Sequence, residues 1–139
     1  MSPQPHHPVD YLLAMPTTLS DVQSWLDRYV AAWRSNDPAL IGALFTDDVR
    51  YRYHPGDEPV VGRRAVVDSW LENPDEPDSW TADYRAWSVT GDRAAATGET
   101  HYSNGGHYFN VYLMVLRDGA CAEFTEWFVT PRDGVTGNG

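Results

Sequence analysis

The sequence contains no lysine, a single cysteine and no long run of apolar residues. The lone Cys121 excludes a disulfide within the chain, and the absence of a charged, then apolar leader favours a reducing, cytoplasmic location. No stretch approaches the ~20 apolar residues that a membrane-spanning helix needs. The sequence has 10 cationic side chains, all of them arginine, and 20 acidic ones, so the net charge is −10. This balance argues against nucleic acid and anionic membranes as partners, because their phosphates would be repelled.

Aromatic residues are abundant instead, with 6 Trp and 8 Tyr among 139 residues. A chain so rich in aromatic side chains is not disordered, and its length predicts one domain with its own core, which we place at 19–132. A proline-rich extension, 1–18, precedes it; there we interpret His6 and His7 as solvated, and expect the apolar residues 11–15 to pack on the domain or on a partner subunit. Residues 133–139 form the expected flexible tail.

Apolar residues at steps of three and four predict the first helix, with Ser20 and Gln23 fitting a capping box at its start. Its apolar stripe consists of Val22, Trp25, Leu26, Tyr29, Val30 and Trp33. Asp37 as N-cap and Pro38 at the first helical position predict a short second helix that continues to Phe45. Residues 63–71 predict a third helix.

A period of two predicts strands at 49–53, 80–89, 93–103, 107–117 and 120–130. The last four are joined by short turns that contain glycine, so they are expected to form an antiparallel meander. Helices followed by such strands predict an α+β fold, in which three helices pack on one face of a curved sheet. The sheet and helices would form a cone whose open end is the expected pocket.

Alternation along the last strand places Glu126 on one face with Ala122, Phe124 and Phe128. A carboxyl group among aromatic side chains loses hydration, which raises its pKa and suits acid–base chemistry near neutral pH. The alternative is a structural ion pair with Arg50 or Arg52.

The preceding strand places Asn110 and Tyr112 on one face, where an amide and a phenol could bind a carbonyl or hydroxyl group. Its opposite face is apolar and consists of Phe109, Val111, Leu113 and Val115. Because such a face needs a cover, we expect a homodimer across it, unless the apolar segment around Leu12 covers it.

The spacing of the residues does not indicate a metal site or a cofactor site. His54, His101, His107 and Glu126 could meet around a metal, but no closely spaced histidine pair indicates one, so none is predicted. Phosphate-loop, dinucleotide and nucleophile-elbow motifs are lacking, and no cofactor is expected. Cys121 is placed on the outer face of the last strand, as a packing residue.

Three segments, in this order, resemble the SnoaL-like branch of the nuclear transport factor 2-like superfamily. They are "RYVAAWRSNDPALIGALFTDDVRYRYHP", "VVGRRAV" and "FNVYLMVLRDGACAEFTEWFVTP". The resemblance covers about residues 19–131 and implies a cone-shaped, usually dimeric α+β domain with a deep apolar pocket. It leaves the chemistry open, because the superfamily includes polyketide cyclases, ketosteroid isomerases, dehydratases, epoxide hydrolases and proteins that only bind ligands.

The resemblance also implies roles for single residues. Tyr29 matches the oxyanion-hole tyrosine of ketosteroid isomerases, but Tyr53, next to His54, stands where they have a catalytic aspartate. Their second acid is likewise replaced in the stretch from Asn110 to Tyr112, so isomerisation by their mechanism is not expected.

Glu126 matches the last-strand aspartate of limonene-type epoxide hydrolases, and Tyr51 matches their first-strand tyrosine. Tyr53 replaces their asparagine, and Glu99-x-His101 stands at their Arg-x-Asp. The acid–histidine pair of SnoaL-like cyclases is best resembled by Glu126 with His54 or His101.

Together these features predict an enzyme without cofactor that acts on a small, hydrophobic, oxygenated molecule by acid–base catalysis. Cyclisation, isomerisation, dehydration and hydration all fit. The expected roles are acid–base for Glu126; hydrogen-bond donation for Tyr29 and Tyr53; proton transfer for His54 or His101; positioning for Asn110, Tyr112 and Tyr51; and apolar walls for Trp25, Trp33, Phe124 and Phe128. The alternative is a module of the same fold that binds a ligand or dimerises without catalysis.

Overall fold

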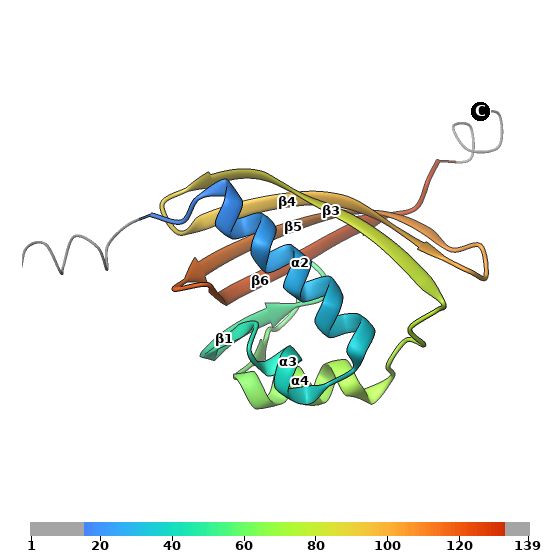
Figure 1. The fold of residues 1–139 in the computed structure, drawn as a ribbon, viewed down its shortest axis with the longest axis horizontal. Coiled ribbons are helices and arrows are strands. Elements are labelled where there is room, and N and C mark those ends of the chain that lie inside the picture. The colour runs from blue at the N-terminus through green and yellow to red at the C-terminus, as the bar shows by residue number, and fades with distance from the viewer. Residues whose placement is uncertain (1–15, 133–139) are drawn as a thin grey trace, which may run out of the picture.

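The computed structural model describes residues 16–132, so the predicted apolar segment 11–15, the His6–His7 pair and the tail 133–139 lie outside the described residues. Figure 1 shows helices packed against a single curved sheet. The elements are α2 (Leu19–Ser35), α3 (Pro38–Gly42), β1 (Phe45–Arg52), β2 (Val60–Val61), α4 (Arg63–Glu72), β3 (Trp80–Thr90), β4 (Arg93–Tyr102), β5 (His107–Arg117) and β6 (Ala120–Val129). None of the helices in this range combines the length and apolar character needed to cross a bilayer.

Helix α2 has its capping box two residues earlier than predicted. Thr18, not Ser20, is the N-cap: its hydroxyl accepts from the Asp21 backbone N–H, and the Asp21 carboxylate accepts from the Thr18 N–H. Asp21 also lies at the positive end of the helix dipole. The apolar stripe is confirmed, since Val22, Trp25, Leu26 and Tyr29 are buried.

The second helix starts as predicted, with Asp37 accepting from the Ala39 N–H and Pro38 in the first turn. It ends at Gly42 rather than at Phe45, because Phe45 already belongs to β1. Both Leu44 and Phe45 are buried, so the apolar pattern alone does not distinguish the end of the helix from the start of the strand. The short strand β2 was not predicted.

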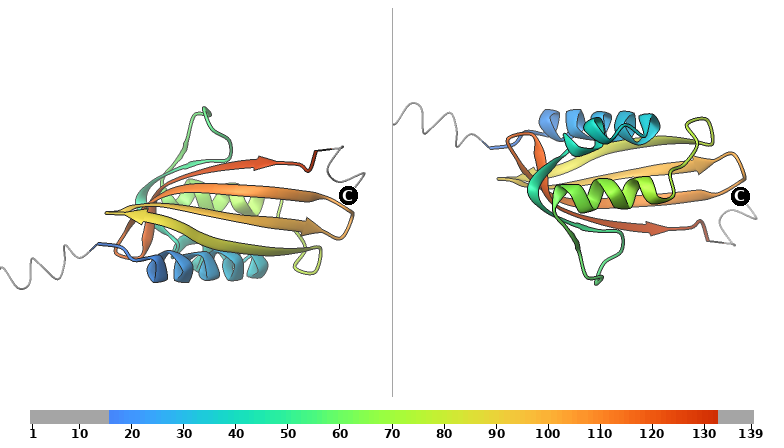
Figure 2. Two further views of the ribbon diagram at one scale, coloured as in Figure 1. Left: turned by 90° about the horizontal axis from the view of Figure 1, so that it is seen from above. Right: turned by 90° about the horizontal axis from the view of Figure 1, so that it is seen from below.

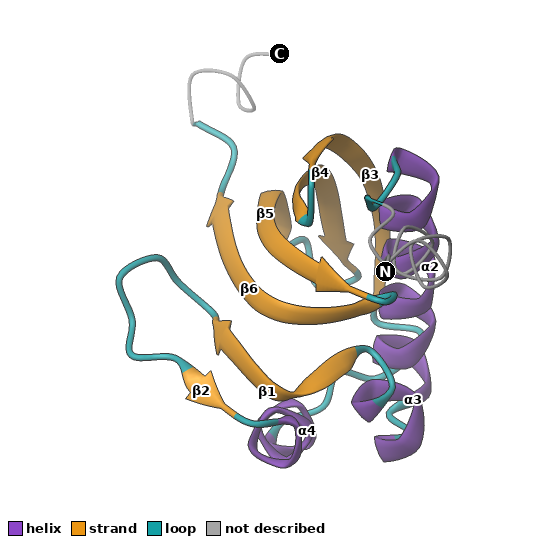
Figure 3. Ribbon diagram, turned by 90° about the vertical axis from the view of Figure 1, so that its left-hand side faces the viewer, coloured by secondary structure: helices purple, strands orange, loops and turns teal. Residues whose placement is uncertain are grey.

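The sheet has the order β2-β1-β6-β5-β4-β3. The predicted meander of β3 to β6 is antiparallel throughout, and β1 joins it by parallel pairing with β6. Helix α2 packs against β3 and α4 against β1, so that sheet and helices surround one interior space (Figures 2 and 3). The α+β cone predicted from the sequence is confirmed.

A β-bulge in β6 changes which side chains point inward near its start. Leu116 pairs with Cys121, but its neighbour Val115 pairs with Glu123, so β6 carries an extra residue there. Cys121 and Ala122 are consequently both buried. The prediction of Cys121 on the outer face is therefore wrong; its thiol donates to the Glu123 carbonyl, and burial raises its pKa.

Candidate functional site

A cavity of about 560 Å³ lies inside the cone and reaches its open end. Seven of the 8 tyrosines of the sequence line it: Tyr29, Tyr51, Tyr53, Tyr84, Tyr102, Tyr108 and Tyr112. Its other lining residues come from α2, α4, the loop 73–75 and strands β4 to β6. The volume lies in the range of pockets that hold small organic molecules.

Glu126 is the carboxylate on the sheet wall of this cavity. Ion pairs in the described part of the chain involve Asp47, Asp48, Asp83 and Glu99, and none includes Glu126. The alternative of an ion pair with Arg50 or Arg52 is wrong: Arg50 is exposed, and the Arg52 Nε donates to the Asp57 carbonyl. Glu126 is thus a largely buried acid without a cationic partner in residues 16–132.

A chain of hydrogen bonds leads across the sheet to this carboxylate. The Asn110 Nδ2 donates to Glu126 Oε2 at 2.9 Å, and the Thr100 hydroxyl donates to Asn110 Oδ1 at 2.9 Å. Because the single Thr100 proton is used there, the Tyr84 hydroxyl must donate to Thr100, at 2.5 Å. All three donors are oriented toward Glu126, so each bond polarises the next.

The environment of Glu126 raises the pKa of its carboxyl group to a value near neutral pH. Burial raises the pKa of its carboxyl from 4.5 to about 7, and the hydrogen bond from Asn110 acts in the opposite direction. Loss of hydration disfavours the charged form, while a donor stabilises it. A group with such a pKa is present in both protonation states near pH 7, as general acid–base catalysis requires.

The tyrosine hydroxyls around Glu126 remain protonated donors at neutral pH. Burial raises the pKa of Tyr29, Tyr51 and Tyr112 well above the ordinary 10. The pKa of Tyr84 is raised to about 12 by the same cause. Neutral O–H groups held in the cavity wall can stabilise negative charge that develops on a bound oxygen.

Helix α4 contributes two polar groups to the opposite wall. The hydroxyls of Tyr53 and Ser69 are hydrogen-bonded at 2.5 Å. The indole Nε1 of Trp70 is buried and has no hydrogen-bond partner within the described residues. Trp70 lines the cavity with other atoms of its side chain, and a buried N–H group without a partner is costly.

The loop between α4 and β3 is anchored at the mouth by Asp75. Its carboxylate accepts from the Trp33 indole at 3.2 Å and from the Tyr102 hydroxyl at 3.3 Å. Trp33 also stacks on Trp80, with ring centroids 3.5 Å apart. These contacts hold an aromatic rim at the entrance.

A family model for the SnoaL-like domain matches residues 26–131, which include most of the cavity-lining segments just described. The chain belongs to the SnoaL-like domain family. No curated protein matches its sequence.

Solved structures share the fold of this SnoaL-like domain at low sequence identity. An NTF-2 like protein of unknown function from Burkholderia xenovorans is 20% identical over 81% of this chain and 86% of that one, with a TM-score of 0.66. For a proposed ketosteroid isomerase from Kribbella flavida the identity is 18%, the coverage 82% of each chain and the TM-score 0.66. An LEH-like epoxide hydrolase from M. tuberculosis is 12% identical, over 80% of this chain and 84% of its own, with a TM-score of 0.59.

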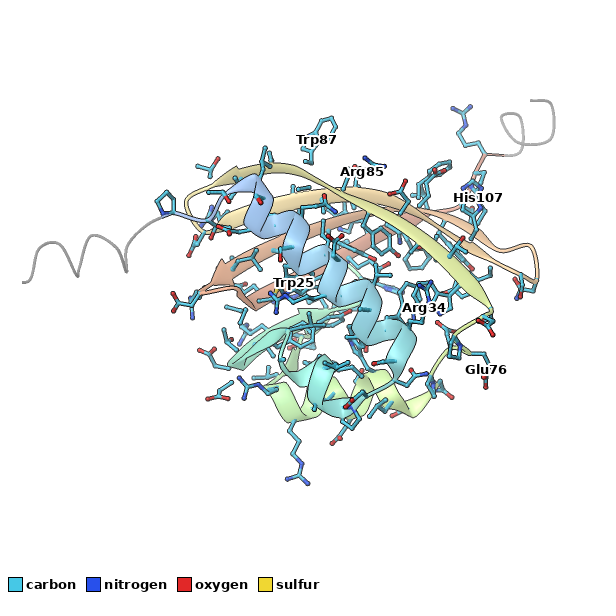
Figure 4. All side chains as sticks on the ribbon, in the orientation of Figure 1. Trp25, Arg34, Glu76, Arg85, Trp87 and His107 are labelled. Atoms are coloured by element: carbon cyan, nitrogen blue, oxygen red, sulfur yellow. The ribbon has the colours of Figure 1, made fainter. Side chains whose placement is uncertain are left out.

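Most residues singled out in the sequence of this SnoaL-like domain meet in the cavity, but four do not line it. Those that line it are Tyr29, Trp33, Tyr51, Tyr53, Asn110, Tyr112, Glu126 and Phe128. Trp25 and Phe124 are fully buried in the core beneath the cavity, and the Trp25 indole donates to the Leu44 carbonyl. Figure 4 shows Trp25 on α2.

The two histidines expected to carry protons lie outside the lining. His54 is exposed, with its ring 5.2 Å from that of Phe128. His101 is on the outer face of β4, because its neighbours Thr100 and Tyr102 point into the cavity. The geometry therefore removes His101 from the proposed site, and with it the correspondence of Glu99-x-His101 to the epoxide hydrolase motif.

Several lining residues were not found from the sequence: Ser69, Trp70, Asp75, Tyr84, Thr100, Tyr102 and Tyr108. For Tyr84, Thr100 and Tyr102 a signal existed, since alternation along 80–90 and 93–102 places them on one face with small buried alanines.

Asn110→Ala is expected to move the pKa of Glu126 upward from about 7, because Asn110 supplies the hydrogen bond that lowers it. The change also leaves Thr100 without its acceptor, at a cost of about 1–3 kcal/mol in the free energy of unfolding. Carboxyl ¹³C chemical shifts measured against pH test the first effect, and urea unfolding tests the second. Val111→Ala, the next residue on the outer face, is the control; an unchanged Glu126 pKa in Asn110→Ala contradicts the assignment.

Proposed function

We propose that this SnoaL-like domain is an enzyme that uses its own side chains for acid–base catalysis on a small, hydrophobic, oxygenated molecule. Cyclisation, isomerisation, dehydration and hydration are the reaction types that fit. The observation that carries the proposal is a largely buried carboxyl, Glu126, without a cationic partner in the described chain, in a cavity of about 560 Å³ lined by tyrosines.

Glu126 is assigned the transfer of the proton. Asn110 holds Oε2, whereas Oε1 accepts no hydrogen bond from any described residue, so Oε1 is the atom that would exchange a proton with the substrate. Tyr29 and Tyr53 would donate to the substrate oxygen on which negative charge develops, as oxyanion-hole donors do. Asn110 and Tyr112 would position the reacting carbonyl or hydroxyl group.

The cavity walls support a substrate with an apolar body and a few oxygen atoms. Trp33, Tyr51 and Phe128 supply aromatic surface, and the hydroxyls of Tyr53 and Ser69 offer polar groups for an oxygen atom. The activities named for the fold neighbours from Kribbella flavida and M. tuberculosis, ketosteroid isomerase and epoxide hydrolase, are consistent with such a substrate.

A binding module without catalysis is the second candidate. It is favoured by the position of His54 and His101, because neither lines the cavity and Glu126 therefore has no histidine beside it as a second proton carrier. A ligand would then be held by the tyrosines and released unchanged.

Glu126→Gln separates the two candidates. Ligands are first found by NMR screening with hydrophobic ketones, alcohols and epoxides, and each ligand is then incubated with the protein and analysed by mass spectrometry. For an enzyme we expect turnover by the parent and a kcat lower by about 10²–10⁴-fold in Glu126→Gln, with binding retained. Glu123→Gln, an exposed position of the same strand, is the control. Binding to the parent without conversion of any ligand supports the binding module.

The outer face of the sheet supports the expected homodimer. Phe109, Leu113 and Trp127 are between 40% and 48% exposed there, and together they form an apolar surface on β5 and β6. A second copy of the chain would cover it. The buried, free thiol of Cys121 is consistent with the proposed cytoplasmic location.

A further inference from the structure

Two histidines and a glutamate meet on the outer face of the sheet, on the side opposite the cavity. Glu99 and His101 belong to β4, and His107 begins β5. Their neighbours Thr100, Tyr102 and Tyr108 line the cavity, so alternation along each strand directs these three side chains outward. Figure 4 shows His107 at the start of β5.

Strand register places the three groups next to one another. His101 and His107 are direct cross-strand partners, and their rings stack with centroids 4.0 Å apart and planes at 20°. Glu99 is two residues before His101, on the same face, and its Oε1 lies 3.1 Å from the His107 Nε2. One potential ligand atom from each residue lies within 4.8 Å of the other two.

We propose that Glu99, His101 and His107 bind one divalent transition-metal ion of the zinc class. Two imidazoles and a carboxylate are a donor set typical of Zn²⁺ and its neighbours, whereas Mg²⁺ and Ca²⁺ prefer oxygen ligands alone. Ligands of a tetrahedral zinc ion, at 2.0–2.2 Å, are about 3.3 Å from each other. The Glu99–His107 separation of 3.1 Å already meets this requirement, and the His101 nitrogen, within 4.8 Å of the other two atoms, would have to come closer by rotation of its side chain.

Neighbouring side chains surround this Glu99–His101–His107 cluster on both sides. Asp83 of β3 is the cross-strand partner of Glu99 and adds a second acidic side chain, although Arg85 pairs with it at 3.2 Å. On the other side, the ring of Phe109 lies 4.8 Å from that of His107 and limits its rotation. An imidazole oriented by its neighbours loses less entropy when it binds a metal.

A metal ion at this position would join β4 to β5 close to the turn at 103–106. It would be separated from Glu126 and Asn110 by the sheet itself, so it is not a reactant in the proposed acid–base chemistry. With three protein ligands, a fourth coordination position remains open to solvent or to a partner's side chain. Binding of the ion to the folded chain alone would raise the unfolding temperature.

The test is calorimetric titration of the full-length chain with ZnCl₂ near neutral pH, after removal of metals with a chelator. Because His6 and His7 could supply imidazoles of their own, all variants carry His6→Ala and His7→Ala. In this background we expect one equivalent of Zn²⁺ to bind and Mg²⁺ not to bind. His101→Ala and His107→Ala should each lower the Zn²⁺ affinity by roughly 100-fold or more, and Glu99→Gln should lower it less.

His54→Ala is the matched control, since His54 is exposed and its ring contacts Phe128, a residue that lines the cavity on the other side of the sheet. Imidazole ¹⁵N shifts provide a second readout: Zn²⁺ should move the resonances of His101 and His107 and leave those of His54 unchanged. An absence of Zn²⁺ binding in the background chain overturns the proposal, as does an affinity that His101→Ala and His107→Ala leave unaltered. In either case Glu99 and His107 form an ordinary ion pair.

Discussion

Glu126→Gln is expected to stabilise the folded protein above pH 7 and to remove much of its pH dependence between pH 4.5 and 7. In the folded chain burial raises the pKa of this carboxyl from 4.5 to about 7. The folded state therefore holds its proton over a range in which the unfolded state has lost it. Below pH 4.5 the group is protonated in both states and carries no penalty. Between pH 4.5 and 7 only the unfolded state ionises, so stability falls, and above pH 7 the full cost of the buried charge is present.

The size of this effect follows from the shift in pKa. Each pKa unit corresponds to 1.36 kcal/mol, so ionisation of Glu126 costs about 3 kcal/mol of folding free energy at pH 8. Glutamine retains an oxygen that can accept from Asn110 Nδ2 and cannot ionise. We therefore expect Glu126→Gln to match the parent at pH 4 and to exceed its stability by up to about 3 kcal/mol at pH 8.

Urea unfolding at several pH values, with m-values recorded, measures this difference. Glu123→Gln, at an exposed site of β6, serves as the control and should leave the pH profile unchanged. A carboxylate that is paired in the folded chain would behave in the opposite way: its replacement would lower stability by about 1–3 kcal/mol at neutral pH. That outcome would remove the main support for Glu126 as the acid–base group.

Gly98→Ala is expected to be among the most damaging single substitutions in the chain, with a loss of at least about 3 kcal/mol or no folded protein. Gly98 pairs across the strands with Tyr84. A Cβ at Gly98 would overlap with the Tyr84 ring and the Asp83 carbonyl oxygen, and would lie 2.8 Å from the Tyr84 Cα. Two of these atoms belong to the backbone of β3, so the overlap is relieved only by separating β3 from β4.

The same close approach positions the hydrogen-bond chain of the cavity. Without a side chain at Gly98, the ring of Tyr84 covers the glycine and its hydroxyl reaches Thr100, two residues further along β4. Thermal and urea unfolding measure the loss. Gly42→Ala is the control, because a Cβ there meets its neighbours at 3.6 Å or more, an ordinary contact. A stability of Gly98→Ala within 1 kcal/mol of the parent would contradict the packing of Tyr84 on Gly98.

The sequence by itself determined the elements other than β2, and the face of the strand residues away from the bulge at Cys121. Turns with glycine and a period of two locate β3 to β6, and the same alternation places Asn110, Tyr112 and Glu126 on one side. These signals are local, because they depend on neighbouring residues and on water at the surface. Such signals are weaker at the ends of helices and strands. For this reason the N-cap of α2 is Thr18 and not the predicted Ser20, and β1 begins at Phe45, earlier than predicted.

Only the tertiary structure decided which groups meet. Alternation predicts that the Glu126 side chain points inward, but it does not predict whether an arginine side chain lies beside it. The parallel pairing of β1 with β6 leaves Arg50 exposed and Glu126 without a cation among the described residues. The Thr100–Asn110 hydrogen bond depends on the register of β4 and β5, which no pattern within either strand encodes. Register and strand order are set by packing across the whole sheet, and for that reason the acid could be named from the sequence while its partners could not.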